Sequence, residues 1–339
     1  MKTNFTINQR SNPLMQMMEK NLRKCVHCGF CLPSCPTYSV LGDERESPRG
    51  RIYLIKDMLE SGEEINKEVV AHVDSCLSCL ACLSACPAGV DYQNYIDYAR
   101  NHIEHNYKRH WYERVFRNTI VYIITHGMVF KIALTIAKVI KPFSRFLNLR
   151  FANMVNMAPE KLSVAKFSNR DRIFSPEVKK IKRVALLLGC AQHVLRPSIN
   201  EATIRLLNRM GFEVVISKGV GCCGALSQHI GNVNTAKDLA KTNIDSWLKD
   251  YDEGGLDHIV INTAGCGTEI KNYAHMFKDD PIYREKAQKI SYLARDISEL
   301  ISEHQLPEAS LEDQPTIIYH DACSLMHGQG ITREPRKNL

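Results

Sequence analysis

The chain has 339 residues, 44% of them hydrophobic and 24% charged, and its formal net charge is +7. This composition is ordinary for a globular protein, and the length suggests two or three domains. Thirteen cysteines, an odd number, argue against a disulfide scaffold. The first 20 residues lack the apolar stretch of a secretory signal, so we expect the protein to be cytoplasmic.

The first predicted element is a helix over residues 11–24. Asn12 can cap its N-terminus, and Pro13 suits its first turn. Apolar residues recur on one face of this helix, and we expect that face to be buried. They are Leu14, Met18 and Leu22.

A repeated cysteine pattern follows, C-x₂-C-x₂-C-x₃-C-P, at Cys25–Pro36 and again at Cys76–Pro87, 51 residues further on. In the bacterial ferredoxin form of this run, three cysteines hold one [4Fe–4S] cluster and the fourth ligates the other cluster. Zinc sites and disulfides are the alternatives, and neither explains a third cysteine and a fourth followed by proline. The pattern therefore predicts a two-cluster electron-transfer module.

The spacing also predicts which cysteines share a cluster. The first three of each run lie on one tight loop, whereas the fourth begins a helix and its proline turns the chain away. The first cluster is expected on Cys25, Cys28, Cys31 and Cys86, and the second on Cys76, Cys79, Cys82 and Cys35.

Helices are predicted between and after the two motifs. One helix runs from Pro48 to Leu59 and ends near Gly62, a second leads into Cys76, and helical sequence continues over residues 92–117. We therefore expect residues 1–106 to form a helical domain that carries both clusters.

Residues 107–180 are expected to form a basic and apolar helical segment followed by a linker at 158–180. From Arg100 to Arg150 there are ten Lys or Arg against two Glu, around an apolar run at Ile120–Ile140. Buried helices packing over the cluster domain, an interfacial or partner-binding surface, and a membrane span with Lys131 near its centre are all open alternatives. The basic flanks suit anionic lipid or an acidic partner. No nucleic-acid motif accompanies the charge, so no nucleic-acid partner is expected.

Residues 181–315 alternate between strands and helices, which predicts an α/β domain. The overall fold class is therefore α plus α/β. Strands are predicted at Val184–Leu188, Glu213–Ser217 and His258–Asn262, and helices at Asn200–Met210 and Thr235–Leu248.

The remaining cysteines are all predicted to follow strands, where open α/β sheets place their ligand-binding loops. They are Cys190, Cys222, Cys223, Cys266 and Cys323. The first four could meet in one pocket, and the alternative is that they are small buried apolar side chains. Gly219–Gly224 also fits a G-x-G-x-x-G dinucleotide loop, although it is not in the first βα turn.

An internal repeat is indicated because residues 183–200 resemble residues 316–335: strand, small residues, cysteine, polar turn, proline. We therefore expect residues 316–339 to begin a second cysteine-rich domain that is truncated in this sequence.

Four segments resemble one known family. They are CVHCGFCLPSCPTYSVLGDERESPRGRIYLIKDMLESG, the GCAQ turn, GCCGALSQHIGN and NTAGCGTEIKNY. Over residues 15–339 the chain is similar to the iron–sulfur subunit of bacterial glycolate oxidase. This resemblance implies a helical ferredoxin-type domain with two [4Fe–4S] clusters, followed by an α/β cysteine-rich (CCG) domain. Relatives of that domain bind an unusual cluster, which implies a third cluster on Cys190, Cys222, Cys223 and Cys266.

The same resemblance implies an oxidoreductase subunit without catalytic residues of its own. FAD in the partner subunits of glycolate oxidase would oxidise glycolate to glyoxylate, and this chain would pass the electrons to a quinone-type acceptor. Peripheral contact with the inner face of the cell membrane is then expected. The alternatives are the equivalent subunit of a D-lactate or glycerol-3-phosphate oxidising complex, a heterodisulfide-reductase-like thiol reductase, and a structural zinc protein. Arg45, Arg49 and Arg51 would either stabilise reduced clusters, dock the flavin subunit, or form exposed ion pairs.

Overall fold

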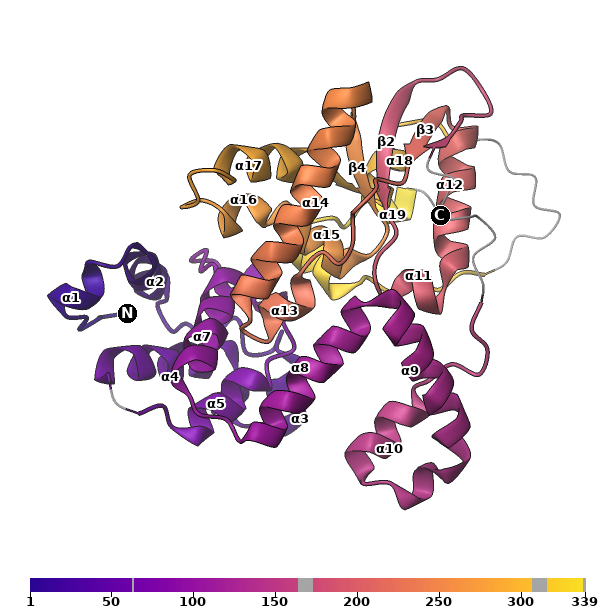
Figure 1. Ribbon diagram of the computed structural model, residues 1–339. Coiled ribbons are helices and arrows are strands. Elements are labelled where there is room, and N and C mark those ends of the chain that lie inside the picture. The colour runs from indigo at the N-terminus through magenta and orange to yellow at the C-terminus, as the bar shows by residue number, and fades with distance from the viewer. Residues whose placement is uncertain (63, 164–172, 307–315, 338–339) are drawn as a thin grey trace. The chain divides into compact units, whose positions relative to one another are not determined.

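The computed structural model describes residues 1–62, 64–163, 173–306 and 316–337, and the chain divides into two compact units (Figure 1). The helical unit comprises Met1–His110, Leu226–Ala236 and Asp321–Ile331. The sheet unit comprises Trp111–Ala225, Lys237–His320 and Thr332–Leu339.

The helical unit contains only helices and turns among its described residues. Its elements are α1 (Ile7–Arg10), α2 (Pro13–Lys24), α3 (Pro36–Leu41), η1 (Glu44–Glu46), α4 (Pro48–Ser61), α5 (Lys67–Asp74), α6 (Ala81–Ser84), α7 (Tyr92–Asn106), most of α13 (Ala225–His229) and the π-turn η3 (Ser324–Gly328).

Local sequence explains where the two long N-terminal helices begin and end. The side chain of Asn12 accepts a hydrogen bond from the Leu14 amide at the start of α2. Helix α4 begins at Pro48 and ends before Gly62, whose φ of 62° only glycine adopts readily. Both helices were predicted, but Leu14 does not lie on the buried face of α2. It is 40% exposed, because the buried stripe runs through Met15 and Met18 instead.

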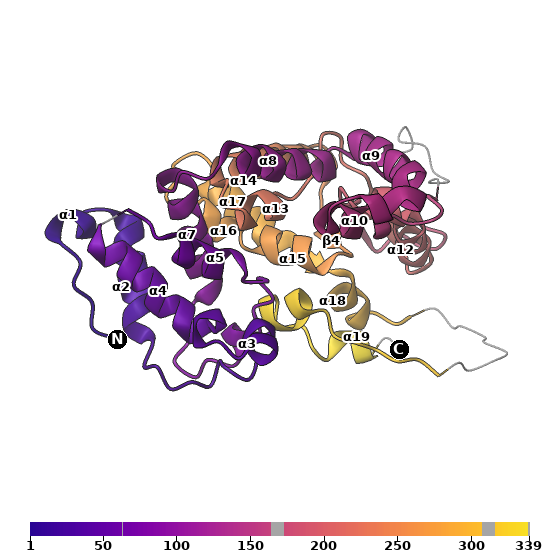
Figure 2. The same ribbon diagram turned by 90° about the horizontal axis from the view of Figure 1, so that it is seen from below.

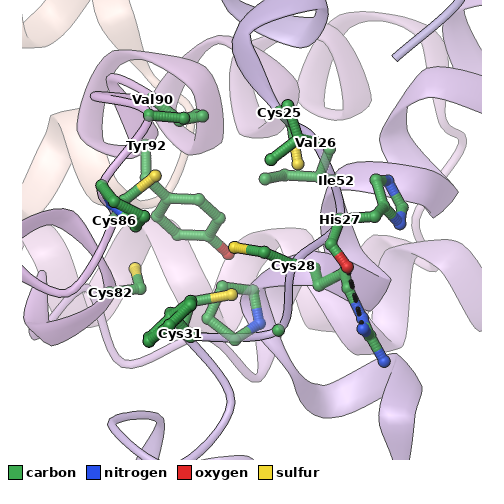
Figure 3. A pocket seen from close by; sticks show the side chains of 16 residues that line it. Cys25, Val26, His27, Cys28, Cys31, Ile52, Cys82, Cys86, Val90 and Tyr92 are labelled. Carbon is green, nitrogen blue, oxygen red and sulfur yellow. Dashed lines mark hydrogen bonds between the residues drawn. The ribbon is translucent and has the colours of Figure 1, made fainter.

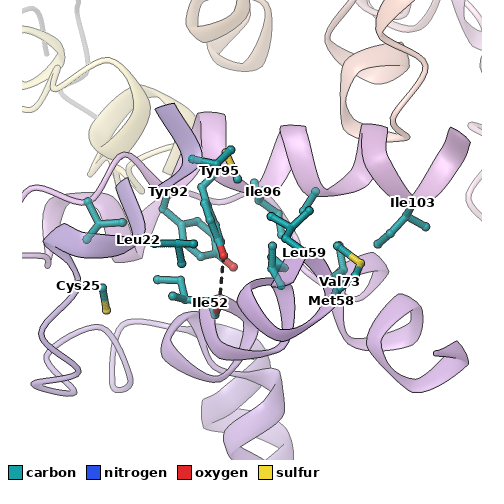
Figure 4. Packing of buried hydrophobic residues seen from close by; sticks show 14 of the residues in the cluster. Leu22, Cys25, Ile52, Met58, Leu59, Val73, Tyr92, Tyr95, Ile96 and Ile103 are labelled. Atoms are coloured by element: carbon teal, nitrogen blue, oxygen red, sulfur yellow. Dashed lines mark hydrogen bonds between the residues drawn. The ribbon is translucent and has the colours of Figure 1, made fainter. Parts of the chain in front are cut away.

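Apolar side chains from α2, α4, α5 and α7 form the core of this unit (Figure 4). Tyr95 of α7 is part of it, and its hydroxyl donates to the Ile52 carbonyl of α4 at 3.1 Å. The most deeply buried residues include Leu22, Ile55, Val73, Ile96 and Ile103. This core fixes the helices from which the cysteine loops extend.

The sheet unit begins with a helical segment of α8 (Trp111–Thr125), α9 (Gly127–Ile140), η2 (Lys141–Phe146) and α10 (Leu149–Asn156). The predicted helical stretch 92–117 is interrupted at residues 107–110, between α7 and α8. Helix α9 has no buried residue and α8 has one, Val121, so the alternative of buried helices is wrong. In the described part of the chain, no single helix has the length and hydropathy to cross a membrane; α8 and the stretch Gly127–Phe146 meet these criteria only together, and they are bent by 109°.

A five-stranded sheet forms the centre of the unit, in the order β1-β3-β2-β4-β5. Strands β2 to β5 pair in parallel, and β1 pairs antiparallel with β3. The strands are β1 (Ile173–Phe174), β2 (Lys182–Leu187), β3 (Phe212–Val215), β4 (His258–Ile261) and β5 (Ala294–Asp296).

Helices cover both faces of this sheet. On one face, α12 (Pro197–Arg209) and α18 (Ile297–Ser302) pack against β2, β3 and β4. On the other, α14 (Val233–Gly254), α15 (Ala264–Lys271) and α17 (Arg284–Leu293) enclose Trp247, which is fully buried. The remaining elements are α11 (Gln192–Leu195), α16 (Tyr273–Met276) and α19 (Glu334–Lys337). This arrangement confirms the predicted mixture of a helical part and an α/β part.

The structure differs from the predictions in two regions after residue 157, and the short strand β5 was also not predicted. Residues 316–320 form no strand, so Cys323 does not follow one; it directly precedes η3 instead. Strand β1 was not predicted, because the region was interpreted as an irregular linker. Part of that linker, residues 164–172, lies outside the described residues.

Candidate iron–sulfur sites

The first cysteine pocket of the helical unit lies where the loop after α2 meets the loop before α7 (Figure 3). Cys25 is the C-cap residue of α2, and the chain then turns through the motif. The cysteines that line this pocket are Cys25, Cys28, Cys31, Cys82 and Cys86. The four residues predicted to share the first cluster are therefore brought together.

A second pocket of the helical unit lies beside the first. Cys35, the N-cap residue of α3, lines it, and so do Pro36 and Arg51. Its other cysteines are Cys76, Cys79 and Cys82. The four residues predicted to share the second cluster thus meet in one place. Tyr92, Pro48 and Cys82 line both pockets and form a common wall.

The two cysteine loops follow the same backbone path. His27 and Ser78, which occupy equivalent positions in the motifs, have φ values of 56° and 52°. Gly29 and Leu80 are also equivalent, and their φ values are 87° and 62°. A left-handed backbone costs a non-glycine residue roughly 1–2 kcal/mol, so tertiary contacts must hold these loops in place. The motif spacing did not reveal this feature.

Two arginines provide such contacts, one for each loop. Arg49 of α4 donates to the carbonyl of His27 at 3.1 Å. Arg100 of α7 is buried and donates to the Cys76 carbonyl at 2.5 Å and to the Ser78 hydroxyl at 2.6 Å. Each guanidinium therefore fixes the start of a cysteine loop. Arg100 was missed in the sequence because it lies 24 residues from Cys76, outside any motif.

Polar side-chain groups lie close to two sulfurs of the second pocket, those of Cys35 and Cys76. The hydroxyl of Thr37 lies 3.2 Å from the sulfur of Cys35, and Nη1 of Arg51 lies 3.9 Å from the same sulfur. The hydroxyl of Tyr92 points to the sulfur of Cys76 at 3.9 Å. Among the described residues, no side chain makes such a hydrogen bond to the four sulfurs assigned to the first cluster. The two pockets therefore differ in the hydrogen bonds that side chains offer to their sulfurs.

Arg51 is the centre of a buried polar network. Its side chain is only 1% exposed, and it pairs with Glu46 at 2.5 Å and donates to the His72 carbonyl at 2.6 Å. His72 in turn contacts Glu46 at 2.6 Å through Nδ1. The alternative of an exposed ion pair is therefore wrong for Arg51. It is correct for Arg45, which is largely exposed and pairs with Asp43 at 2.8 Å.

Burial affects the protonation of several of these groups. It raises the pKa of the Cys31, Cys79 and Cys82 thiols, and the effect is largest for Cys82. Metal binding must therefore displace protons from these thiols. Burial also raises the pKa of Tyr92 well above its usual value, so its hydroxyl keeps the proton that it directs at Cys76.

The donor set fits iron–sulfur clusters. Thiolates are the ligands of such clusters, and each pocket is lined by at least four cysteines from two separate loops. Within the described ranges, no three His, Cys, Asp or Glu side chains are grouped closely enough to hold a single metal ion. The thiols instead surround a space, as a cluster of several atoms requires.

A second group of cysteines lies at the carboxyl ends of β2, β3 and β4 in the sheet unit. The sulfurs of Cys190 and Cys222 are 3.7 Å apart. Cys223 follows Cys222 in the chain, and Cys266 packs against the same buried cluster as Cys223. These four residues therefore meet in one place. Cys323 belongs to the helical unit and is exposed.

Polar residues that the sequence did not single out hold this group. Asn243 of α14 accepts from the Gly221 amide at 2.8 Å and donates to the Cys222 carbonyl at 2.9 Å. The hydroxyl of Tyr273 donates to the Cys223 carbonyl at 2.7 Å. Both side chains are buried. Asn243 and Tyr273 lie 21 and 50 residues from the cysteines whose carbonyls they bind, so only the fold shows their role.

A cavity of about 360 Å³ adjoins the second group. Cys190, Cys222 and the glycine-rich loop after β3 line it. The buried hydroxyl of Ser217 also lines it and has no hydrogen-bond partner among the described residues. There is thus room for a ligand beside these thiols.

Comparisons with known proteins agree with this division of the chain. Residues 21–90 match the family described as "4Fe-4S dicluster domain", and residues 184–271 match the family described as "Cysteine-rich domain". These matches support iron–sulfur clusters as the cofactors. No solved structure matches the chain.

Curated relatives extend the comparison over the full length. The glycolate oxidase iron–sulfur subunit of Escherichia coli (strain K12) is 36% identical over 339 residues, covering 100% of this chain and 80% of that protein. A probable glycolate oxidase iron–sulfur subunit of Bacillus subtilis (strain 168) is 33% identical, covering 100% of this chain and 79% of that protein. Lactate utilization protein A of the same strain is 28% identical over 160 residues, covering 46% of this chain and 64% of that protein. On the evidence of the two cysteine pockets and these relatives, the chain belongs to the family of glycolate oxidase iron–sulfur subunits.

Proposed function

We propose that this chain relays electrons one at a time from FAD in partner subunits to a quinone-type acceptor during the oxidation of glycolate to glyoxylate. The observation that carries the proposal is the pair of cysteine pockets, each with the four cysteines assigned to one cluster, that share a wall of Cys82, Tyr92 and Pro48. Iron–sulfur clusters are one-electron carriers whose potentials depend on hydrogen bonds and burial. Two adjacent pockets with different donors suit such a relay.

The proposed roles of the chain's own residues follow from the geometry. The first cluster is held by Cys25, Cys28, Cys31 and Cys86, and the second by Cys76, Cys79, Cys82 and Cys35. Arg49 and Arg100 hold the loops, while Arg51 and Tyr92 direct positive charge and a proton donor at the second pocket. No residue of this chain is proposed to act on the hydroxy acid itself.

Each part of the chain has a proposed role. Residues 1–106 would carry the two clusters, 181–315 the first cysteine-rich domain, and 316–339 the start of a second. A third iron–sulfur cluster on Cys190, Cys222, Cys223 and Cys266 is supported by the way these thiols meet beside a cavity. Delivery of electrons to a quinone implies work at the inner face of the cell membrane.

One experiment tests the relay directly. The chain is purified anaerobically with the subunits that accompany it, and glycolate, D-lactate and glycerol 3-phosphate are added in turn while the visible absorbance is followed. The proposal is supported if glycolate bleaches the cluster absorbance at a lower concentration than D-lactate or glycerol 3-phosphate does. Preferential bleaching by D-lactate or glycerol 3-phosphate would assign the chain to a related complex, and a partner without flavin would refute the relay.

A substitution separates the relay from the chemistry at the flavin. We expect Cys28→Ser to remove the paramagnetic signal of the first cluster while glycolate still reduces the flavin. Cys323→Ser is the matched control for the first cluster, because Cys323 is exposed and does not line the first pocket. Loss of flavin reduction in Cys28→Ser, with a normal control, would contradict the proposal that the flavin subunit oxidises glycolate and this chain only relays the electrons.

A thiol reductase is the second candidate, and the thiol contacts favour it. A disulfide substrate could enter the 360 Å³ cavity and meet Cys190 and Cys222. Reduction of a disulfide by the isolated chain with dithionite as electron donor, lost in Cys190→Ser, would support this candidate. An inactive chain with a complete cluster content would exclude it.

A further inference from the structure

The segment from α8 to α10 exposes an unusual amount of apolar surface. On α9, Met128, Ile132, Ile136 and Val139 are between 54% and 76% exposed, and they recur at the spacing of one helix face. Figures 1 and 2 show α10 beside α9, and the two helices are in contact. The stretch η2 to α10 adds further exposed side chains, namely Phe143, Phe146, Leu149, Met154 and Met157.

Positive charge accompanies this apolar surface. Residues 111–157 contain seven Lys or Arg and a single acidic residue, Glu113. Lys131 and Lys138 of α9 are exposed and lie along one edge of the apolar stripe, three and ten residues after Met128. Long basic side chains in that position can reach water or phosphate while the stripe beside them is buried.

We propose that α8 to α10 form a docking surface for an anionic lipid bilayer, lying in its interface without crossing it. We call this the basic apolar surface, defined by the exposed apolar and basic residues of α8, α9, η2 and α10. A helix with an apolar face bordered by Lys or Arg binds such interfaces through buried area and electrostatic attraction. Because α8 and the stretch Gly127–Phe146 are bent by 109°, they do not form one straight helix that could cross the bilayer.

Lipid fits this surface better than a protein partner for two reasons. The exposed side chains are large, flexible or aromatic and come from four consecutive elements. Such side chains can insert into a fluid lipid phase, which needs no complementary shape. Their excess of six positive charges complements a continuous negative surface. The inference rests on the proposed function in one respect: contact with the bilayer would bring the chain to a quinone acceptor, which is dissolved in the membrane.

Vesicle sedimentation tests the proposal on the full chain with its clusters assembled anaerobically. Binding is compared between phosphatidylcholine vesicles and vesicles that also contain phosphatidylglycerol, at low and high salt. We expect binding only to the anionic vesicles, weakened by salt. Ile132→Asp should lower the partition coefficient about tenfold, since a charge replaces an inserted side chain. Its matched control is Ile282→Asp, because Ile282 is also exposed but lies outside this surface.

The charge contribution has its own pair of variants. Lys131→Gln/Lys138→Gln should lower the partition coefficient roughly 30-fold, at about 1 kcal/mol for each basic residue near an anionic surface. Lys180→Gln/Lys249→Gln removes two exposed lysines elsewhere and should have no effect. Circular dichroism and the cluster absorbance confirm that each variant is folded.

Several outcomes would overturn the proposal. These are absence of binding to anionic vesicles, equal losses in the variants and their controls, and resistance of the bound chain to alkaline carbonate, which would indicate a span. If Ile132→Asp released a partner subunit but kept vesicle binding, the surface would be a protein interface. Binding is measured without glycolate, and glycolate bleaching is measured without vesicles. Failure of the lipid contact is thereby distinguished from failure of the electron relay.

Discussion

Replacing Arg51 tests whether the buried guanidinium sets the reduction potential of the second cluster. In the structure its Nη1 lies 3.9 Å from the sulfur of Cys35, and its side chain is almost completely buried. Reduction adds a negative charge to the cluster, and a nearby buried positive charge stabilises that charge. We therefore expect Arg51→Gln to lower the potential of the second cluster and to leave the first unchanged.

The size of the effect follows from the distance. Two unit charges about 4 Å apart interact by about 4 kcal/mol at an effective dielectric constant near 20. The added electron is spread over the cluster, and Glu46, paired with Arg51 at 2.5 Å, offsets part of the positive charge. A net effect of about 1.4 kcal/mol is reasonable, which corresponds to about 60 mV for a one-electron couple.

The assay is a redox titration followed by electron paramagnetic resonance, with both clusters assembled. Arg51→Gln breaks the buried ion pair with Glu46, and removing one partner of such a pair costs about 3–5 kcal/mol of stability. Glu46→Gln/Arg51→Gln removes both charges and should fold better while showing a smaller shift. Arg51→Lys keeps the charge and should shift the potential least. Arg45→Gln is the control, because Arg45 is exposed and pairs with Asp43.

The reasoning would be refuted if the Arg51→Gln protein retained both clusters and an unchanged potential. An equal shift in Arg45→Gln would also refute it, because the effect would then come from net charge rather than from the buried position. If Arg51→Gln does not fold, the question is decided by comparing the shift in reduction potential of Arg51→Lys with that of Glu46→Gln/Arg51→Gln. A larger shift in Arg51→Lys than in the double variant would contradict the electrostatic account.

Three further predictions concern other parts of the chain. Tyr92→Phe removes the hydroxyl directed at Cys76, so the second cluster's potential should fall by about 30 mV, measured in the same titration; a rise would be inconsistent with a donor role. Asn243→Ala leaves the Gly221 amide and the Cys222 carbonyl without their partner. Denaturant unfolding should show that the free energy of unfolding falls by about 2–3 kcal/mol. The Arg10 guanidinium and other donors lower the pKa of Glu19 from 4.5 to about 2, so its stabilisation is present above pH 4.5 and is lost as pH falls toward 2. In Glu19→Gln the free energy of unfolding should therefore vary less with pH over that range. A pH profile identical to that of the unsubstituted chain would exclude the interaction.

The sequence predicted the parts of this protein that depend on local patterns. The helix from Pro48 to Gly62 was predicted from a proline and a glycine at its ends. Strands β2, β3 and β4 were predicted from short apolar runs, whereas the short strands β1 and β5 were not. The two cysteine motifs identified the kind of cofactor because thiolate spacing is set by the cluster itself. Cys323 was placed wrongly, since residues 316–320 form no strand.

The sequence could not show features that depend on long-range packing. Arg51 looked like one of three equivalent arginines, yet the fold buries it and leaves Arg45 exposed. Arg100 and Asn243 hold cysteine loops that lie more than 20 residues away along the chain. The exposure of α9 was also not decided, because an apolar run of that length suits a buried helix and an interfacial helix equally well.

The left-handed residues of the cysteine loops have a consequence for how the protein matures. Arg49 and Arg100 hold these loops through contacts made within the polypeptide. A chain that lost either arginine would have to order that loop with free energy taken from cluster insertion, and its clusters would be incorporated less completely.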